Sequence, residues 1–390
     1  MSSIPLSAPS FKGNEWKYIK ECIDTAWVSS AGEYVDLFEQ KVSEYTGSEY
    51  AVAVVNGTSA LHVSLRIVGV QPGEEVIVPT LTFIAPVNAI AYNGATPVFM
   101  DADEYYNIDA EKTIEFIRYE TDFKDGFTYN KKTGKKISAI IPVHVWGNAA
   151  WLDELSTLCK ERSIAIVEDA SESLGTVYSK GIYSGRHSGT IGKLGCLSFN
   201  GNKIITTGGG GMILTDDQDL AEKAHYLTTQ AKDDKVRYIH DEIGYNYRLT
   251  NIQAALGVAQ LEQLPEFLKR KKKIHRHYLE AVDAIEGLAI AGVPSYADNN
   301  HWLNLVQIDS DKYEEDREEL MTHLNKNGIQ VRPMWTLNHL QKPYKEYQSY
   351  KIERSMRVVG TSLCLPSSTN LNREDIDSII KSLSSLDKIA

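Results

Sequence analysis

The chain has 390 residues, enough for roughly two or three domains, and its 42% hydrophobic and 24% charged residues match a globular protein. A formal net charge of −11 repels nucleic-acid phosphates, so we expect no nucleic-acid partner. The four scattered cysteines form neither a disulfide framework nor a zinc ribbon. With no signal-peptide pattern and no apolar window of about 18 residues, we expect a cytoplasmic protein without a membrane partner.

Two helices are predicted first, over residues 14–27 and 33–46, from apolar residues at helical spacing. From residue 50 onward, short β-branched runs alternate with helical segments, and the helices are predicted to begin at Ser59, Pro86, Trp151 and Asp217. The predicted strands are 51–55, 76–78, 96–99, 137–143, 164–167, 197–199 and 212–214. These runs are apolar throughout, which is typical of strands covered on both faces. The pattern predicts an α/β domain with a mainly parallel sheet.

A polar stretch interrupts this pattern between Asp103 and Ile137, and the residues from Asn130 to Gly134 are typical of a turn. We therefore expect a hairpin insertion near residues 124–137. A long helix is predicted from Asn251 to about residue 285. The segments that follow predict a smaller α+β domain, with strands at 302–308 and 329–332 and helices at 313–327 and 373–386. We place the boundary near residue 255, giving a large domain of 1–255 and a small one of 256–390.

Several common motifs are missing. The segment that ends in Gly192-Lys193-Leu194 fails the P-loop pattern at two positions, and the glycines at 208–211 lack the last glycine of a dinucleotide fingerprint. The ten histidines include no HExxH pair, and no GxSxG elbow occurs. We therefore expect no metal site and no serine-hydrolase chemistry.

A candidate phosphate site lies in the sequence Asn-Gly-Thr-Ser-Ala-Leu at 56–61, between a predicted strand and a predicted helix. Gly57 lets the backbone approach a ligand, and the first helical amides with the hydroxyls of Thr58 and Ser59 suit a phosphate. The simpler alternative is an ordinary helix cap formed by Thr58 or Ser59.

Three further features each have a functional and a structural explanation. Glu168 and Asp169 end a buried strand, where α/β folds bind ligands, and Glu172 follows; they could instead be cap or surface acids. Lys203 precedes four glycines, which indicate a close approach or a positive φ, but it could be a solvated lysine. Phe83 follows the strand at 76–78 and could simply pack in the core.

Together these residues fit one chemistry. A phosphate cup, a carboxylate, a flat aromatic ring and an amine are what a pyridoxal phosphate site requires. The lysine amine would form a Schiff base with the cofactor aldehyde, the carboxylate would pair with the pyridinium nitrogen, and the aromatic ring would stack on the cofactor. The sequence therefore predicts pyridoxal 5′-phosphate as the cofactor.

The chain resembles the sugar aminotransferases of the DegT/DnrJ/EryC1/StrS family over nearly its whole length. The resemblance lies in the opening segment around 27–39, in 56–61 and 79–83, in Pro-Val-His at 142–144, in Glu-Asp-Ala at 168–170 and in the segments 198–203 and 244–257. It implies an aspartate-aminotransferase-like fold of type I. It implies that Lys203 is the catalytic Schiff-base lysine, that Asp169 binds the ring nitrogen and that Phe83 stacks on the ring. Ser198 would contact the phosphate, and Asn246 would reach the phosphate of the partner subunit in a homodimer with shared active sites.

Two positions depart from the family pattern: Gly209 replaces a glutamate, and Glu172 replaces a histidine or glutamine. With the hairpin and the sequence Asn-Gly-Asn-Lys at 200–203, they resemble the legionaminic acid and bacillosamine branch most. That resemblance implies UDP-2-acetamido-2,6-dideoxy-4-ketoglucose as the substrate, aminated at C4 for bacterial surface glycans. A GDP- or dTDP-linked keto sugar is the alternative.

The resemblance also implies L-glutamate as the amino donor and 2-oxoglutarate as its product. Cations should line the path of the nucleotide, so Arg248 and Arg332 are candidate substrate contacts, and Ser29 is a third from the N-terminal segment. Two rivals remain: a sugar dehydratase, which would carry histidine at position 203 in this family, and a non-catalytic regulator that binds the cofactor or a nucleotide sugar.

Overall fold

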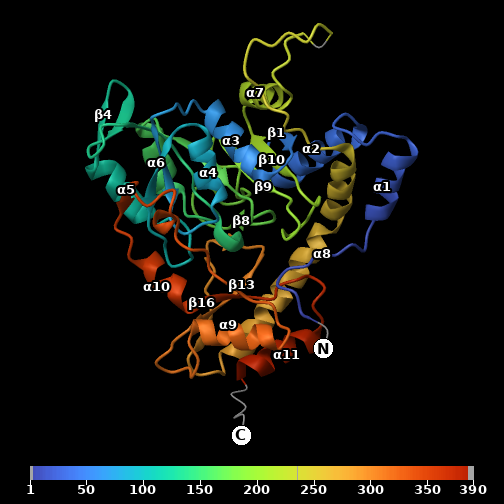
Figure 1. Ribbon diagram of the computed structural model, residues 1–390, viewed down its shortest axis with the longest axis vertical. Coiled ribbons are helices and arrows are strands. Elements are labelled where there is room, and N and C mark those ends of the chain that lie inside the picture. Colours follow the sequence, from blue (N-terminus) through green and yellow to red (C-terminus); the bar gives the residue numbers. More distant parts are fainter. Residues whose placement is uncertain (1–2, 235, 385–390) are drawn as a thin grey trace.

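The computed structural model describes residues 3–234 and 236–384. Figure 1 shows a larger body in which helices surround a central sheet, a smaller body below it, and the long helix α8 (Asn251–Val282) running from one to the other. The main sheet has the strand order β1-β10-β9-β7-β6-β2-β3-β15. Its strands are β1 (Tyr50–Val54), β10 (Gly211–Thr215), β9 (Leu194–Ser198), β7 (Ala165–Asp169), β6 (Lys136–Ile140), β2 (Glu75–Pro79), β3 (Thr96–Met100) and β15 (Ser349–Tyr350).

The sheet is parallel from β9 through β7, β6, β2 and β3 to β15, and antiparallel where β10 joins β1 and β9. Both faces of the sheet are covered, because successive residues of a strand pack into two different hydrophobic clusters. Val78 and Val167 belong to the larger cluster, whereas Ile77 and Ile166 belong to a second one. The larger cluster is completed by α2 (Glu33–Thr46), α3 (Gly57–Ile67), α7 (Gln218–Thr228) and α8, and the second by α5 (Ala110–Tyr119) and α6 (Asp153–Glu161). The predicted α/β fold with a mainly parallel sheet is therefore confirmed.

Most helices begin near the predicted positions, because turn and capping residues mark their starts. Asp217 caps α7 through its carboxylate, and Thr250 and Gln253 form a capping box at the start of α8. The other helices of this body are α1 (Glu15–Asp24), α2 (Glu33–Thr46), α3 (Gly57–Ile67), α4 (Ala85–Tyr92), α5 (Ala110–Tyr119), α6 (Asp153–Glu161) and α7 (Gln218–Thr228), with a short 3₁₀ turn η1 (Val145–Gly147).

The predicted insertion is a pair of hairpins rather than one. Strand β4 (Thr121–Lys124) pairs with β5 (Phe127–Asn130), which pairs with β6, all antiparallel. The predicted turn at Asn130 is present, since the Gly134 N–H donates to the Asn130 carbonyl at 2.8 Å. The first turn, missed from the sequence, uses Asp125 and Gly126, both at positive φ.

The smaller body contains a four-stranded antiparallel sheet in the order β11-β13-β16-β14. Its elements are β11 (Leu288–Ile290), β13 (Asn304–Ile308), β14 (Arg332–Pro333), β16 (Ser362–Leu365), α9 (Arg317–Lys326), α10 (Arg354–Thr361) and α11 (Arg373–Ser384), with a 3₁₀ turn η2 (Asn338–Leu340). The strand predicted over 329–332 is observed as the two-residue β14, and Ile329 instead pairs with Ile4 of the N-terminal segment in an isolated bridge. The division at residue 255 stays a prediction; it falls inside α8.

Besides α8, two strand pairings among the described residues connect the bodies. Strand β15 extends the main sheet from the C-terminal part, and β12 (Ala297–Asp298) pairs with β8 (Val177–Tyr178) in the segment after β7. None of the helices within residues 3–234 and 236–384 is long and apolar enough to span a membrane. The cytoplasmic location stays a prediction.

Candidate active site

A cavity of about 330 Å³ lies at the carboxyl ends of β7 and β9, next to the start of α3. This is the edge of a parallel sheet at which α/β folds bind ligands. Seven predicted site residues line it, together with residues of the loops after β2, β7 and β9 and two tryptophans from the C-terminal part. The predicted residues are Gly57, Thr58, Phe83, Asp169, Glu172, Ser198 and Lys203.

The start of α3 provides a narrow polar cradle. The helix is capped by Asn56, whose Oδ1 accepts the Ser59 N–H at 2.8 Å, so the cap predicted for Thr58 or Ser59 is wrong. A side chain at position 57 would crowd the cradle, because a Cβ there would lie 3.0 Å from the Ser198 Cβ and 3.1 Å from the Ser171 Oγ, and one of these serines would have to shift. Backbone amides at a helix start, within a ring of hydroxyls, suit an anion.

The glycines at 208–211 meet both predicted requirements, a positive φ and a close approach of the backbone. Gly208 has a φ of +79°, in the region that favours glycine. Gly211 lies against the start of α3, where a Cβ would be 2.6 Å from the Asn56 carbonyl carbon. The run therefore lets β10 pass directly behind the cradle.

The two acids that end β7 lie in different surroundings, as expected for adjacent residues of a strand. Glu168 is fully buried away from the cavity. Its carboxylate accepts hydrogen bonds from His144 Nε2 at 2.9 Å and from the amides of Gly189, Ile191 and Gly192 at 2.9, 2.6 and 2.6 Å. Burial alone would raise the pKa of Glu168, but these donors together hold it below its ordinary value.

The geometry also assigns the His144 tautomer. Its Nδ1 accepts the Ala150 N–H at 3.0 Å, so Nε2 carries the proton that is donated to Glu168. The His144 N–H donates to the Asp169 carbonyl at 3.0 Å, which fixes the end of β7. The Pro-Val-His segment therefore supports the site from behind rather than lining it with its histidine.

Asp169 lines the cavity and is 4% exposed. Its Oδ1 accepts the Ser171 N–H at 3.1 Å. Burial raises the pKa of Asp169, and Ser171, the Lys203 charge and His144 offset only part of that effect. A buried carboxyl of this kind favours a cationic partner.

Lys203 and Glu172 form an ion pair in which Glu172 is buried and Lys203 is partly buried. Lys203 Nζ donates to Glu172 Oε1 at 3.2 Å, and Glu172 Oε2 accepts the Trp146 N–H at 2.8 Å. Burial raises the pKa of Glu172, and the Lys203 charge opposes that effect. Glu172 is therefore part of the site rather than solvated.

Aromatic rings also line the cavity, among them Phe83 and Trp335. Phe83 is 54% exposed and lies 6.3 Å from Trp335 between ring centroids, at 59°. Trp335 stacks in turn on Trp146, with centroids 5.0 Å apart. Phe83 is thus available to a flat ligand rather than buried in the core, the alternative considered from the sequence.

The cavity fits pyridoxal phosphate. Gly57, Thr58 and Ser198 would hold the phosphate in the cradle that a Cβ at position 57 would fill. Asp169 would pair with the protonated ring nitrogen, which supplies the cation that its buried carboxyl lacks. Lys203 offers an amine within the same cavity.

The remaining predicted residues lie outside this cavity. Ser59 is 7% exposed and its amide is occupied by the cap; Asn246 is exposed; Ser29 is exposed, and its carbonyl accepts the Asn251 N–H at 2.7 Å. Arg332 is exposed on β14. Their predicted contacts with cofactor or substrate stay predictions.

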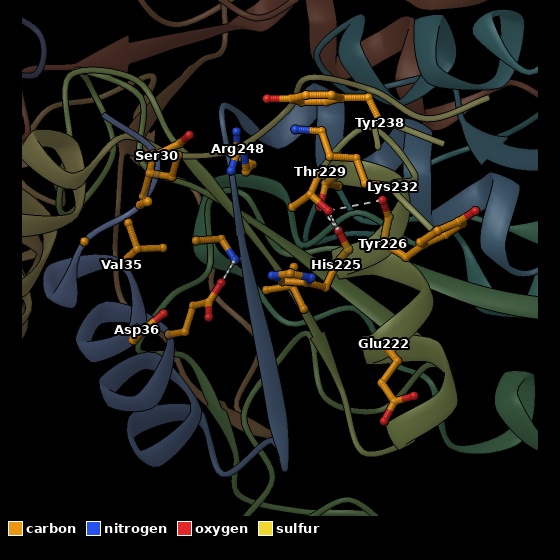
Figure 2. Close-up of a pocket in the computed structure, with 17 residues that line it drawn as sticks. Ser30, Val35, Asp36, Glu222, His225, Tyr226, Thr229, Lys232, Tyr238 and Arg248 are labelled. Atoms are coloured by element: carbon orange, nitrogen blue, oxygen red, sulfur yellow. Dashed lines mark hydrogen bonds between the residues drawn. The ribbon is translucent and has the colours of Figure 1, made fainter. Parts of the chain in front are cut away.

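Arg248 lines a second, larger cavity of about 690 Å³ between α2 and α7. Figure 2 shows Arg248 at this cavity, with Lys232 and Tyr238 on the far side from Val35 and Asp36. The Arg248 Nε is buried without a hydrogen-bond partner in the part of the chain that the structure describes. Arg248 therefore has unused donor capacity, but within one chain it does not line the Lys203 cavity.

Sequence reasoning missed two aromatic residues of the site, Trp302 and Trp335. They come from loops 99 and 132 residues beyond Lys203, with no local motif to mark them. Asn200, Asn202 and Ser171 also line the cavity. Their closeness to Lys203 and Asp169 in the sequence was the available signal.

Comparisons with known proteins place the chain in a family. The DegT/DnrJ/EryC1/StrS aminotransferase family matches residues 9–384. The GDP-perosamine synthase of Escherichia coli O157:H7 is 37% identical, with 98% of each chain covered. EpsN of Bacillus subtilis, whose name describes a pyridoxal phosphate-dependent aminotransferase, is 36% identical over 97% of this chain and 95% of its own.

Solved structures agree with this assignment. A family member from Brucella abortus superposes with a TM-score of 0.85 at 28% identity, over 95% of this chain and 94% of its own. DesI, solved in the presence of its TDP-sugar product, gives a TM-score of 0.87 at 26% identity, over 98% of this chain and 93% of its own. The protein therefore belongs to the DegT/DnrJ/EryC1/StrS aminotransferase family, pyridoxal phosphate-dependent enzymes that aminate nucleotide-linked sugars.

Proposed function

We propose that this enzyme transfers the amino group of L-glutamate to C4 of a nucleotide-linked 4-keto-6-deoxy sugar, with Lys203 as the catalytic residue. The observation that carries the proposal is the shared cavity, where the Lys203 amine, the buried Asp169 carboxyl and the cradle at Gly57 lie together. Bound pyridoxal phosphate supplies a carbonyl for covalent attachment and a ring that accepts electrons. The chain supplies the binding, the charge and the proton transfer.

Each residue has a defined task. The start of α3 and Ser198 bind the phosphate, and Asp169 keeps the ring nitrogen protonated. Lys203 Nζ removes the proton from Cα of the bound amino acid, a general-base role that requires its neutral amine. Glu172 Oε1, 3.2 Å from Nζ, holds the amine within the cavity and accepts its hydrogen bond.

The donor half is expected to release 2-oxoglutarate before the keto sugar binds, which gives ping-pong kinetics. A glutamate-dependent half-reaction, followed by release of 2-oxoglutarate without any sugar, tests this step. Its absence in the presence of cofactor would favour the dehydratase or the regulator instead.

For the nucleotide, we propose guanosine diphosphate first. Relatives from Escherichia coli, Caulobacter vibrioides and Vibrio cholerae, 35–37% identical over 92–98% of this chain, are named GDP-perosamine synthases. The UDP-linked acetamido sugar, favoured by the sequence resemblance at Glu172 and the hairpin, stays the second candidate. The DesI structure, with its TDP-sugar product, adds dTDP to the panel.

A substrate panel decides between them. The purified enzyme, loaded with cofactor and glutamate, is offered GDP-, UDP- and dTDP-linked 4-keto-6-deoxy sugars, and the products are weighed by mass spectrometry. We expect the 4-amino product of the GDP sugar to form with the highest kcat/KM. A higher kcat/KM for the UDP sugar would reverse the order, and no amination of any of them would contradict the proposal.

We also propose a homodimer in which each active site uses residues of both chains. Asn246 is exposed, follows the long loop that projects beyond α7 (Figure 1), and does not line the Lys203 cavity of its own chain. Arg248 lies two residues further on, with its Nε unpartnered. These two observations support a role for both residues at the site of a neighbouring chain.

Complementation tests the shared site. A chain with Lys203→Ala and a chain with Asn246→Ala are each expected to be impaired alone. In a mixed dimer with shared sites, one site regains both intact residues, so co-expression should restore activity. Activity no higher than the average of the two separate variants would show that each site is built from one chain.

A further inference from the structure

The Lys203 amine lies between a carboxylate and the face of an aromatic ring. Its Nζ donates to Glu172 Oε1 at 3.2 Å and lies 4.1 Å from the centroid of the Trp302 ring. Trp302 is 3% exposed and Glu172 6%. An ammonium over the face of tryptophan is attracted by the ring, and more strongly where water is excluded. Two groups from different parts of the chain therefore stabilise the charged amine.

Trp302 also holds the main chain that carries Lys203. Its Nε1–H donates to the Asn202 carbonyl at 2.7 Å, directly before Lys203. The same carbonyl accepts the Ser7 hydroxyl at 2.9 Å. The ring face of Trp302 therefore contacts the end of the Lys203 side chain. Its N–H holds the backbone directly before Lys203.

The loop that presents Trp302 is fixed by buried polar groups. The Trp302 N–H donates to Asn300 Oδ1 at 2.9 Å, and Asn300 Nδ2 donates to the Glu172 carbonyl at 2.8 Å. Lys271, 2% exposed in α8, donates to the Trp302 carbonyl at 2.8 Å. These buried hydrogen bonds fix the orientation of Trp302. A tryptophan that only filled space in the core would not need them.

We propose that Trp302 is a positioning residue for Lys203: in the cofactor-free enzyme its ring face holds the amine beside Glu172, and its N–H fixes the Asn202 backbone. The inference rests on the proposed function, because it concerns the lysine that binds the cofactor. The other titratable groups at the amine are Glu172 and Asp169. Behind them, His144 acts on Asp169 and Cys364 lies within electrostatic reach of Glu172.

The test measures covalent capture of added pyridoxal phosphate by the apoenzyme, as a function of pH. Absorbance gives the capture rate, and borohydride reduction with peptide mass analysis identifies the lysine. Capture uses the neutral amine, so removing a group that stabilises the ammonium shifts the rate profile to lower pH. In Trp302→Leu we expect the half-maximal pH to fall by about one unit.

Trp302→Phe separates the two roles of the indole. Phenylalanine keeps an aromatic face but cannot donate to the Asn202 carbonyl, so the half-maximal pH should fall less than in Trp302→Leu. Trp151→Leu is the control, because Trp151 lies outside the cavity, where its Nε1–H donates to Glu154 Oε2 at 2.7 Å. Its half-maximal pH should equal that of the wild type.

Thermal unfolding shows which variants fold. If Trp302→Leu does not fold, Trp302→Phe alone tests the inference. A half-maximal pH that stays unchanged or rises in the folded Trp302 variants would overturn the inference and leave the proposed function intact. Failure of the wild-type apoenzyme to capture the cofactor at Lys203 would instead overturn the proposed function.

Discussion

The two sides of β7 place adjacent carboxyl groups in opposite situations. Behind the strand, Glu168 has His144 and three backbone amides as donors, and its pKa is held below the ordinary value. In front, Asp169 accepts the Ser171 N–H, and burial raises its pKa. A buried carboxylate whose donors are complete supports the fold. A buried carboxylate that lacks a cationic partner can bind a cationic group of a ligand, but it lowers the stability of the fold while it is unpaired.

The pH dependence of stability should have opposite signs on the two sides. Glu168 has a lowered pKa, so it stabilises the fold at pH values above its ordinary pKa of 4.5. That contribution is lost as the pH falls through the pKa of Glu168 in the folded protein. Asp169, with its raised pKa, lowers stability as the pH rises from 3.8 through its folded pKa. A cation bound at Asp169 should remove that loss.

The largest expected effect is on catalysis in front of the strand. Lys203→Ala removes the amine that binds the cofactor and moves the proton, so the rate of amino transfer should fall by at least about 10⁴-fold. Glutamate-dependent formation of 2-oxoglutarate measures it. Circular dichroism serves as the control for an intact fold, and a rate close to that of the wild type would remove Lys203 from the mechanism.

The next largest effect is on stability behind the strand. In Glu168→Gln, either orientation of the amide sets its NH₂ against two donors, because each carboxylate oxygen accepts two hydrogen bonds. We expect the free energy of unfolding to fall by about 3 kcal/mol, measured by urea denaturation. Unchanged stability would mean that the network behind β7 does not support the fold.

Asp169→Asn should change activity and stability in opposite directions. The neutral amide can still accept the Ser171 N–H, but it cannot hold the ring nitrogen protonated, so kcat should fall by about a hundredfold or more. Without cofactor, the variant should be more stable than the wild type by about 1 kcal/mol at pH 8, because a buried charge is removed. A less stable apoprotein would make Asp169 a structural acid like Glu168.

The smallest effect is expected at Glu172. Glu172→Gln keeps one oxygen to accept either the Trp146 N–H or the Lys203 amine, and loses the charge of the pair. We expect kcat to fall about tenfold, with little change in the KM for glutamate. A change confined to KM would mean that Glu172 contacts the donor rather than Lys203.

The sequence predicts the front of the site better than the back. Asp169 and Lys203 follow buried strands directly, and Gly57 marks the turn into α3, so local pattern and family resemblance place all three. Which of two adjacent acids faces a cavity depends on strand register, and the donors of Glu168 lie more than 20 residues away on either side. Trp302 enters through long-range packing, which no local pattern encodes. The positions of Asn246 and Arg248 relative to a site depend on a second chain.

The central claim is that the cavity at the end of β7 binds pyridoxal phosphate through the Lys203 amine. The most direct measurement is the mass of proteolytic peptides after the enzyme has been incubated with the cofactor and reduced with borohydride. The account predicts a pyridoxyl-phosphate adduct on the peptide that contains Lys203, absent from Lys203→Ala. An adduct on another lysine, or none at all, would contradict it.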